Sequence, residues 1–527
     1  MKLTYNVDAK PREIGYGKLL VFALQQMLAI LAATIAVPAI IGNDMSQSAA
    51  LFGAGVGTLV YLLFTKFRSP VFLGSSFAFI GSMFAAFGGA ASMQLGYLGL
   101  LFGALFAGLV YVVIAVIVKF AGVKWINKIM PAVIIGPTVA IIGLSLAGNA
   151  VGDLQSGNFV TTLKAEDYQI VATDASLLQY NKDDKTYSID PTASGYAAID
   201  KDVDLTAPIP ADKIHDEITV TAEENEETHE LVFTLTRQDG SVYIALLCGL
   251  VTLAATIVCS VYAKKTLKTI PFIIGICAGY IVAAIFTGIG IAADVAALRI
   301  IDFSKFAHMQ WVPDFTFLKA FKGFKELTGA YVGTIAVAYI PVAFVVFAEH
   351  LADHKNISSI IEKDLTEDPG LDKTLLGDGI GSIAGAFFGG CPNTTYGESI
   401  GCVAISGNAS VVTIFCTAIL AIIASFVAPF VTFLATIPSC VMGGVCIALY
   451  GFIAVSGLKM IQKVDLEDNR NLFVVSVILI AGIGGLTIGF GKVTITAVAC
   501  ALILGILANL LVNIKKKTAV EESKTEE

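Results

Sequence analysis

The sequence predicts an all-α polytopic membrane protein with fourteen transmembrane segments, arranged as two repeats of seven with opposite orientations. Of its 527 residues, 56% are hydrophobic and only 14% are charged, whereas a soluble domain carries about 25% charged residues. A bilayer accommodates such a surplus, because the lipid-facing and the core-facing positions of a spanning helix are both apolar. Seven is an odd number, so the second repeat enters the membrane from the opposite side.

The fourteen apolar runs are the elements of this prediction. Most of them approach the roughly 20 residues that a spanning helix needs. Three runs, 71–90, 376–390 and 391–406, are short, rich in glycine or dotted with polar residues. The runs cover residues 18–41, 49–65, 71–90, 95–120, 129–150, 241–262, 269–292, 329–352, 376–390, 391–406, 409–433, 436–457, 471–490 and 494–513.

The placement of lysine and arginine predicts the orientation in the cell membrane (the inner or plasma membrane). Positive residues gather in alternate connections, such as Lys66 and Arg68 after the second run, and cytoplasmic loops carry this excess. The connection 293–328 is an exception, with five basic residues on the outer side. Residues 1–17 are polar and lack the apolar stretch of a signal peptide. We therefore expect residues 1–17 and 514–527 to be cytoplasmic.

Residues 152–240 interrupt the apolar pattern and are expected outside the cell. They hold 19 acidic and 6 basic residues, out of 42 and 34 in the whole chain, so they account for the negative net charge. Alternating patches at 185–190 and 229–237 indicate short strands. The segment is either a small β-rich module or a partly disordered loop. It is either a solvated insertion or a cap that captures a partner or substrate.

Two interrupted segments, 71–84 and 389–405, occupy the third and tenth places among the fourteen runs. Polar residues at membrane depth weaken a helix, and irregular backbone is tolerated there only beside protein or a water-filled cavity. Transporters with inverted repeats place such segments at the membrane midplane, with half-helix N-termini aimed at the substrate. Each segment has a pair of hydroxyl residues before an aromatic. The small polar residues expected to support a site are Ser75, Ser76, Asn393, Thr394 and Thr395.

Three carboxylates are candidates for proton coupling. Glu398 lies in the second interrupted segment, and Glu349 lies near the end of the run 329–352. A carboxylate at membrane depth is costly and indicates function. Asp353 is four residues after Glu349, so both lie on one helix face and resist being ionised together. The alternative is that Glu349 and Asp353 are helix-end residues at the membrane interface.

Other classes of protein lack support in the sequence. An intramembrane enzyme needs a metal cluster or a nucleophile pair, and the five histidines form no HExxH motif. The nine cysteines form no CxxC pair and read as small apolar residues. No phosphate-binding loop is present. A channel or anion transporter would need a basic residue near the interrupted segments, and neither segment carries one.

The sequence resembles the nucleobase–ascorbate transporter family and, within it, the bacterial uracil permeases. The resemblance covers nearly the whole chain apart from 152–240. It rests on LGSSFAFI (73–80), FAEHLADH (347–354), KDLTEDPGLDKTLLGDGI (363–380), FFGGCPNTTYGESIG (387–401) and MGGVCIALYG (442–451).

The resemblance implies a core domain, from runs 1–4 (within 18–151) and 8–11 (329–433), and a gate domain. The gate comprises run 5, runs 6–7 (within 241–328) and runs 12–14 (434–513).

A proton-coupled symporter for uracil is implied, with the proton as coupling ion, no other cofactor, no nucleic acid and a possible homodimer through the gate domain. The substrate would lie between the third and tenth segments, each a short strand followed by a half-helix. The implied substrate-binding residues are Phe77, Glu349, Tyr396, Gly397, Glu398 and Tyr450, and the proton-coupling residues are Glu349, Asp353 and Glu398.

Several positions depart from the family pattern. The first segment has Gln25-Gln26 where many members have Gln-His, and Asp353 stands where some uracil permeases have histidine. The signature after Glu398 has Ser399 and Ser406 where asparagine and threonine are usual. Glutamate at 398 favours a pyrimidine over xanthine. A xanthine or purine transporter of the same family is an alternative function. An anion transporter or channel on the same fold is a second alternative.

Overall fold

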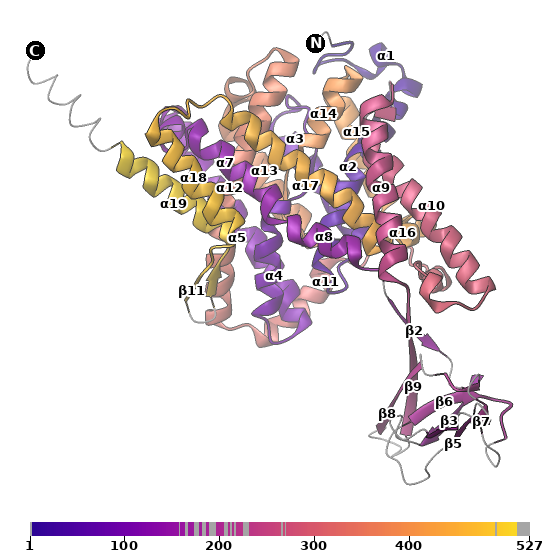
Figure 1. Cartoon of the computed structure of the whole chain (residues 1–527). Coiled ribbons are helices and arrows are strands. Elements are labelled where there is room, and N and C mark those ends of the chain that lie inside the picture. The colour runs from indigo at the N-terminus through magenta and orange to yellow at the C-terminus, as the bar shows by residue number, and fades with distance from the viewer. Residues whose placement is uncertain are drawn as a thin grey trace, which may run out of the picture. The chain divides into compact units, whose positions relative to one another are not determined.

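A computed structural model gives the fold of the chain (Figure 1). The structure describes residues 3–157, 159–163, 167–172, 179–181, 186–188, 196–204, 209–210, 213–215, 218–224, 231–264, 267–268, 270–490 and 493–513. The expected cytoplasmic tail 514–527 lies outside these residues. The chain forms two compact units, one made of 1–154, 249–280 and 303–527 and the other of 155–248 and 281–302.

Helices form at the fourteen predicted places, so the predicted fold class is confirmed. The first seven segments are α2 (Tyr16–Ile41), α3 (Gln47–Phe64), β1 (Leu73–Ser75) with η1 (Phe77–Phe79) and α4 (Ile80–Gly88), α5 (Met93–Ala121), α7 (Ala132–Ser145) with α8 (Ala147–Gln155), α9 (Val242–Tyr262) and α10 (Pro271–Ala292). The second seven are α12 (Gly329–Ile361), α13 (Leu371–Gly389), β10 (Asn393–Thr395) with α14 (Gly397–Ser406), α15 (Val411–Ala424) with α16 (Ala428–Ala435), α17 (Ser439–Ile461), α18 (Asn469–Ile483) and α19 (Ala497–Val512).

The length and composition of these helices suit a membrane. Within the described part of the chain, eight helices are long and apolar enough to span a bilayer. α15 and α16 pass the same test together and are bent by 84° at their junction. Short helices connect the segments: α1 (Pro11–Ile14), α6 (Lys124–Ile129), η6 (Ala296–Leu298), η7 (Phe303–His308), α11 (Thr316–Ala320), η8 (Phe321–Glu326) and η9 (Thr366–Gly370). The chain is thus a multi-pass membrane protein.

The glycine-rich run 376–390 belongs to a continuous helix, α13, rather than to an irregular segment. Its glycines recur every fourth residue from Gly377 to Gly389, on the face that packs against α3. A Cβ atom on Gly53 of α3 would lie 2.3 Å from the carbonyl oxygen of Gly385. Small residues at this spacing let two membrane helices approach closely, so the glycines serve packing here.

The run 471–490 is not a single helix. α18 ends at Ile483, and β11 (Ile488–Phe490) pairs antiparallel with β12 (Val493–Ile495). Gly484 and Gly485 follow the helix, and Gly485 has a φ of +71°, a conformation that glycine adopts without strain. The chain therefore leaves the helix at this pair and forms a hairpin before α19.

Helices of the first unit pack in two groups. α2, α3, α5, α12, α13 and α15 pack against one another. α17, α18 and α19 pack beside α7 in the second group (Figure 1). α12 contacts α7 and α19, and α17 contacts α2, so the two groups meet along these helices.

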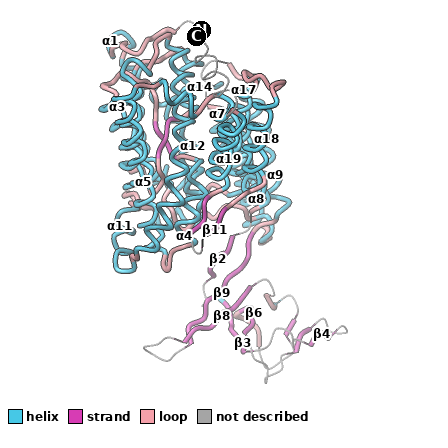
Figure 2. The backbone as a smooth tube through the Cα atoms, turned by 90° about the vertical axis from the view of Figure 1, so that its left-hand side faces the viewer, coloured by secondary structure: helices cyan, strands magenta, loops and turns pink. Residues whose placement is uncertain are grey.

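The second unit contains the acidic insertion, which is built from strands (Figure 2). β2 (Phe159–Leu163), β9 (Leu231–Asp239) and β8 (Ile218–Glu224) form one antiparallel sheet, in that order. β3 (Tyr168–Ala172) pairs with β6 (Tyr196–Asp200), and β4 (Gln179–Asn181), β5 (Thr186–Ser188) and β7 (Ile209–Pro210) form a third sheet. The β-rich interpretation of the insertion is confirmed for the described residues.

Candidate functional site

The two interrupted segments meet as a pair of antiparallel strands. β1 and β10 align Leu73 with Thr395 and Ser75 with Asn393. Beyond the pair, the Ser76 N–H donates to Pro392 O at 2.9 Å, and the Tyr396 N–H donates to Phe72 O at 3.2 Å. Each strand therefore satisfies the backbone polar groups of the other, which is what permits extended backbone inside a membrane protein.

Side chains from α3 and from the strands themselves fix this pair in place. Thr58 Oγ1 accepts from the Leu73 N–H at 2.9 Å and donates to Ala54 O at 2.8 Å. The Asn393 side-chain amide donates to Gly53 O at 3.2 Å. The Tyr396 hydroxyl donates to Ser75 O at 2.8 Å, across the two strands. Asn393 and Ser75 thus support the site from behind.

A half-helix follows each strand, and its N-terminus faces the same region. Residues 77–88 follow β1, and α14 begins at Gly397 after β10. Neither Ser76 nor Tyr396, the residues at the two N-cap positions, makes a side-chain capping bond. The first N–H groups of a helix have no partner within the helix and carry partial positive charge. The two N-termini can therefore donate hydrogen bonds to an acceptor placed between them.

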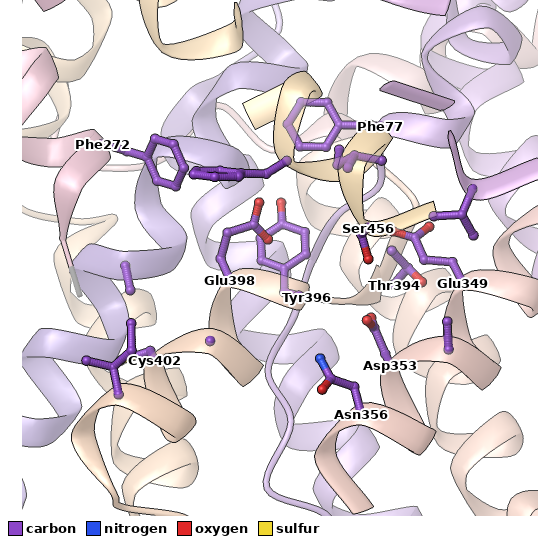
Figure 3. A pocket seen from close by; sticks show the side chains of 18 of the residues that line it. Phe77, Phe272, Glu349, Asp353, Asn356, Thr394, Tyr396, Glu398, Cys402 and Ser456 are labelled. Carbon is purple, nitrogen blue, oxygen red and sulfur yellow. The ribbon is translucent and has the colours of Figure 1, made fainter. Parts of the chain in front are cut away.

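A cavity of about 320 Å³ lies in front of these N-termini. Its walls come from both helix groups, and Figure 3 shows the side chains that surround it. Of the predicted site residues, the following line it: Ser76, Phe77, Glu349, Asp353, Thr394, Tyr396, Gly397 and Glu398. Its size lies at the lower end of the range for small-molecule pockets.

The three predicted carboxylates converge on this cavity. Glu349 and Asp353 come from α12, and Glu398 comes from the first turn of α14, beside Tyr396 (Figure 3). Asp353 accepts a hydrogen bond of 2.7 Å from the Thr395 hydroxyl, which links α12 to the end of β10. Glu349 and Asp353 thus lie at the cavity, although the sequence left an interfacial position open.

Tyr450 has a different place from the other predicted residues. It is buried in α17 and packs edge-on against the Phe77 ring, with ring centroids 5.5 Å apart, but it does not line the cavity. Within the next two turns, α17 contributes Phe452, Ile453 and Ser456 to the cavity wall. Tyr450 therefore supports Phe77 from the side of the second helix group.

Sequence reasoning missed several lining residues. Asn356 follows Glu349 by seven positions, so helical spacing places it on the same face and could have revealed it. Phe272 of α10 and Phe452 of α17 lie with ring centroids 5.8 Å apart, and an isolated phenylalanine in an apolar run gives no signal. Lys268 also lines the cavity and is exposed.

The back face of α12 carries a second polar group that the sequence did not reveal. His350 Nδ1 lies 2.7 Å from Asp378 Oδ2 of α13. His354 Nε2 lies 2.9 Å from the Tyr61 hydroxyl of α3, and the two histidine rings stack at 3.9 Å. These contacts hold α12 against α3 and α13, so the opposite face of α12, with Glu349, is presented to the cavity.

The fold and the site define a membrane transporter, in which a central cavity faces two half-helix N-termini. The model of the Permease family matches residues 17–177 and 234–489 of the chain. A uracil permease of Bacillus caldolyticus is 34% identical over 502 residues, which cover 94% of this chain and 92% of the relative. A uracil permease of Escherichia coli K12 is 29% identical, with 93% and 90% covered. The chain belongs to this permease family, which confirms the resemblance to the nucleobase–ascorbate transporters and their uracil permease branch.

Solved structures support the fold independently. The transmembrane domain of a cyanobacterial bicarbonate transporter, BicA, matches with a TM-score of 0.55 at 14% identity, over 96% of this chain and 100% of that chain. The murine anion transporter Slc26a9, in its inward-facing state, matches with a TM-score of 0.55 at 13% identity, over 94% of this chain and 68% of that chain. At these identities the likeness concerns the fold alone.

Proposed function

We propose that the protein is a proton-coupled symporter that imports a nucleobase, with uracil as the preferred substrate. The observation that carries this proposal is the arrangement around the cavity. The carboxylates of Glu349 and Glu398 line the same cavity as Phe77 and Gly397, where the first N–H groups of the two half-helices lie. The uracil permeases among the relatives cover nearly the whole chain, which supports the same substrate here.

The chemistry of uracil suits this arrangement. Its planar ring carries two N–H donors and two carbonyl acceptors. Glu398 would accept from ring N–H groups, and the N–H groups of Phe77 and Gly397 would donate to the carbonyls. The rings of Phe77, Tyr396 and Phe272 line the same cavity, and aromatic faces stack well on a planar base. A site made of hydrogen bonds rejects analogues that leave its buried groups unpaired.

Proton coupling is assigned to Glu349, Asp353 and Glu398. Three carboxylates around one small cavity repel one another when all are ionised, so one of them would take up a proton. We propose that the substrate binds preferentially to this protonated form. Symport requires that proton and substrate stabilise the same conformations. The proton is the only coupling ion that we propose.

Alternating access would come from movement of the core domain against the gate domain. The cavity extends along α12 to Asn356 and along α14 to Ile405, toward the connection that contacts the N-terminal segment. If both termini are cytoplasmic and the insertion lies outside the cell, as we propose, this end of the cavity faces the cytoplasm. Exposure to the other side would then need the two helix groups to move relative to each other.

The alternatives differ in what the cavity would hold. A xanthine or purine transporter would use the same carboxylates on a larger base. An anion transporter is disfavoured, because three carboxylates line the cavity and Lys268 is the cation among the described lining residues. The nature of the base is therefore the main question.

Competition binding tests the proposal directly. Purified protein would be titrated with radiolabelled uracil in the presence of unlabelled uracil, xanthine, adenine or bicarbonate. We expect uracil alone to compete at low concentration, and Glu398→Gln to abolish the difference between uracil and xanthine. Displacement of the label by xanthine at a lower concentration than by uracil would assign the protein to the purine transporters. An absence of saturable uracil binding would refute the proposed substrate.

A further inference from the structure

The N-terminal segment contacts the connection that follows α14. The N–H groups of Thr4 and Tyr5 donate to Gly407 O at 2.8 and 3.1 Å. The Ala409 N–H donates to Tyr5 O at 2.9 Å, and the Val411 N–H donates to Val7 O at 3.2 Å. Residues 4–9, which we call the strap, therefore run alongside residues 407–411 and form one parallel β-bridge, between Tyr5 and Asn408.

Side chains secure the strap further. The Ser410 hydroxyl, fully buried, donates to Ala9 O at 2.8 Å. Val7 and Ala9 are 4% and 8% exposed, whereas Thr4, Asn6 and Asp8 are exposed, so alternate residues of the strap face the protein. A small apolar cluster continues the contact from the strap into α1, α2 and α15, and consists of Ala9, Ile14 and Leu19, with Tyr5, Phe22, Val412 and Cys416 packed on it.

The strap lies at one end of α14, and the candidate site lies at the other. Gly397 and Glu398 begin the helix, Gly401, Cys402 and Ile405 line the cavity along it, and Gly407 ends it in a left-handed conformation with a φ of +66°. Near its first turn, α14 is held by α2, because Gln26 Nε2 donates to Ser399 Oγ at 2.6 Å. The strap supplies the corresponding support at the last turn.

We infer that the strap is a positioning element of the transport site, which fixes the inner end of α14 and so the direction of Glu398 and of the Gly397 N–H. This inference rests on the proposed function. A helix of ten residues is about 15 Å long, so a tilt about its supported first turn shifts the cavity-lining residues. A misplacement of about 1 Å at a reacting or binding group can cost about a hundredfold.

Removal of residues 2–9 tests the inference in proteoliposomes with radiolabelled uracil. We expect the KM for uracil to rise at least about tenfold, while a control without residues 514–527 stays within about twofold of the full chain. A synthetic peptide of residues 1–15 should restore the KM of the truncated protein. An unchanged KM after truncation, or a KM that the peptide does not restore, would overturn the inference. Absence of uracil uptake by the full chain would instead refute the proposed function, and the inference with it.

A point variant keeps the test decisive if the truncated protein does not fold. Ser410→Ala removes one bond between the strap and the connection. Ser425→Ala is its control, because that hydroxyl is equally buried and donates to Ile422 O within its own turn at 2.7 Å. We expect Ser410→Ala to raise the KM about threefold and Ser425→Ala to leave it unchanged. Equal KM values for both variants would overturn the inference.

Discussion

Replacement of Gly74 by alanine should weaken uracil binding by about one to two orders of magnitude. A Cβ atom at this position would lie 2.3 and 2.4 Å from two carbons of the Tyr396 ring. Non-bonded carbons separate to about 3.5 Å, so the ring must move by roughly 1 Å. Tyr396 is 3% exposed and has little room. The movement breaks its bond to Ser75 O, worth about 1 kcal/mol, and displaces the N-terminus of α14.

Gly81→Ala is the matched control, because it lies in the same interrupted segment. Its Cβ atom would be 3.4 Å from Thr496 Cγ2, an ordinary contact, and alanine favours the helix α4. The Kd for uracil would be measured by equilibrium binding, and folding by thermal unfolding in detergent. The reasoning is refuted if the Gly74→Ala variant binds uracil like the wild type, or if both variants lose affinity equally.

Three further predictions concern the site, the packing of the helices and the insertion. Glu398→Gln should raise the KM for uracil about ten- to hundredfold in uptake assays, because a bond to a charged group contributes about 1.5–3 kcal/mol. Gly53→Ala should lower the thermal unfolding temperature, because its Cβ atom would lie 2.3 Å from Gly385 O and overpacking costs about 1–3 kcal/mol. Asp200→Asn should speed hydrogen exchange in β3 and β6 at pH 7, because it removes the ion pair with Lys213 and weakens the hydrogen bond with His215.

Each of these predictions has a control or a refuting result. Gly333→Ala meets nothing within 4 Å and should leave the unfolding temperature unchanged or raise it. Equal losses in both glycine variants would contradict the packing argument. A normal KM in Glu398→Gln would remove that residue from the site.

The pH dependence of the Asp200 effect follows from its contacts with Lys213 and His215. Lys213 and His215 each lie 2.8 Å from its carboxylate and hold the pKa of Asp200 below its usual range. The pKa of an aspartate in the unfolded chain is near 4. When folding lowers this pKa, the ionised carboxylate stabilises the fold at pH values above about 4, and the stabilisation is lost as the pH falls through the pKa of the folded state. The difference between Asp200→Asn and the wild type should therefore shrink below about pH 4. A difference that persists at pH 2 would contradict this account.

Much of the fold could be predicted because hydrophobic length and polar interruption are local properties of the sequence. The two interrupted segments were recognisable by the hydroxyl pairs Ser75-Ser76 and Thr394-Thr395, and the family resemblance implied that each begins with a short strand. The continuity of α13 was not, because its glycines lower local apolarity and their purpose depends on the distant helix α3. The hairpin after Ile483 was missed because the apolar residues Leu486, Ile488 and Phe490 continue the run of the preceding helix past Gly484 and Gly485.

The site was predictable where costly residues lie in apolar runs, as with Glu349 and Glu398. Phe272 and Phe452 gave no signal, because aromatic side chains are common in any membrane helix and only the packing of α10 on α17 brings these two together. The resemblance led to Tyr450, whereas the cavity wall uses Phe452, Ile453 and Ser456, further along α17. Contacts between distant segments, such as the strap on α14, cannot be read from local patterns.

Uptake of radiolabelled uracil into proteoliposomes tests the central claim most directly. The wild-type chain would be compared with and without an inward proton gradient, and with excess xanthine. We predict accumulation that is driven by the gradient, resists xanthine and is lost in Glu349→Gln. Uracil uptake that ignores the gradient would contradict proton coupling, and an absence of uracil uptake beside gradient-driven xanthine uptake would contradict the assignment of the substrate.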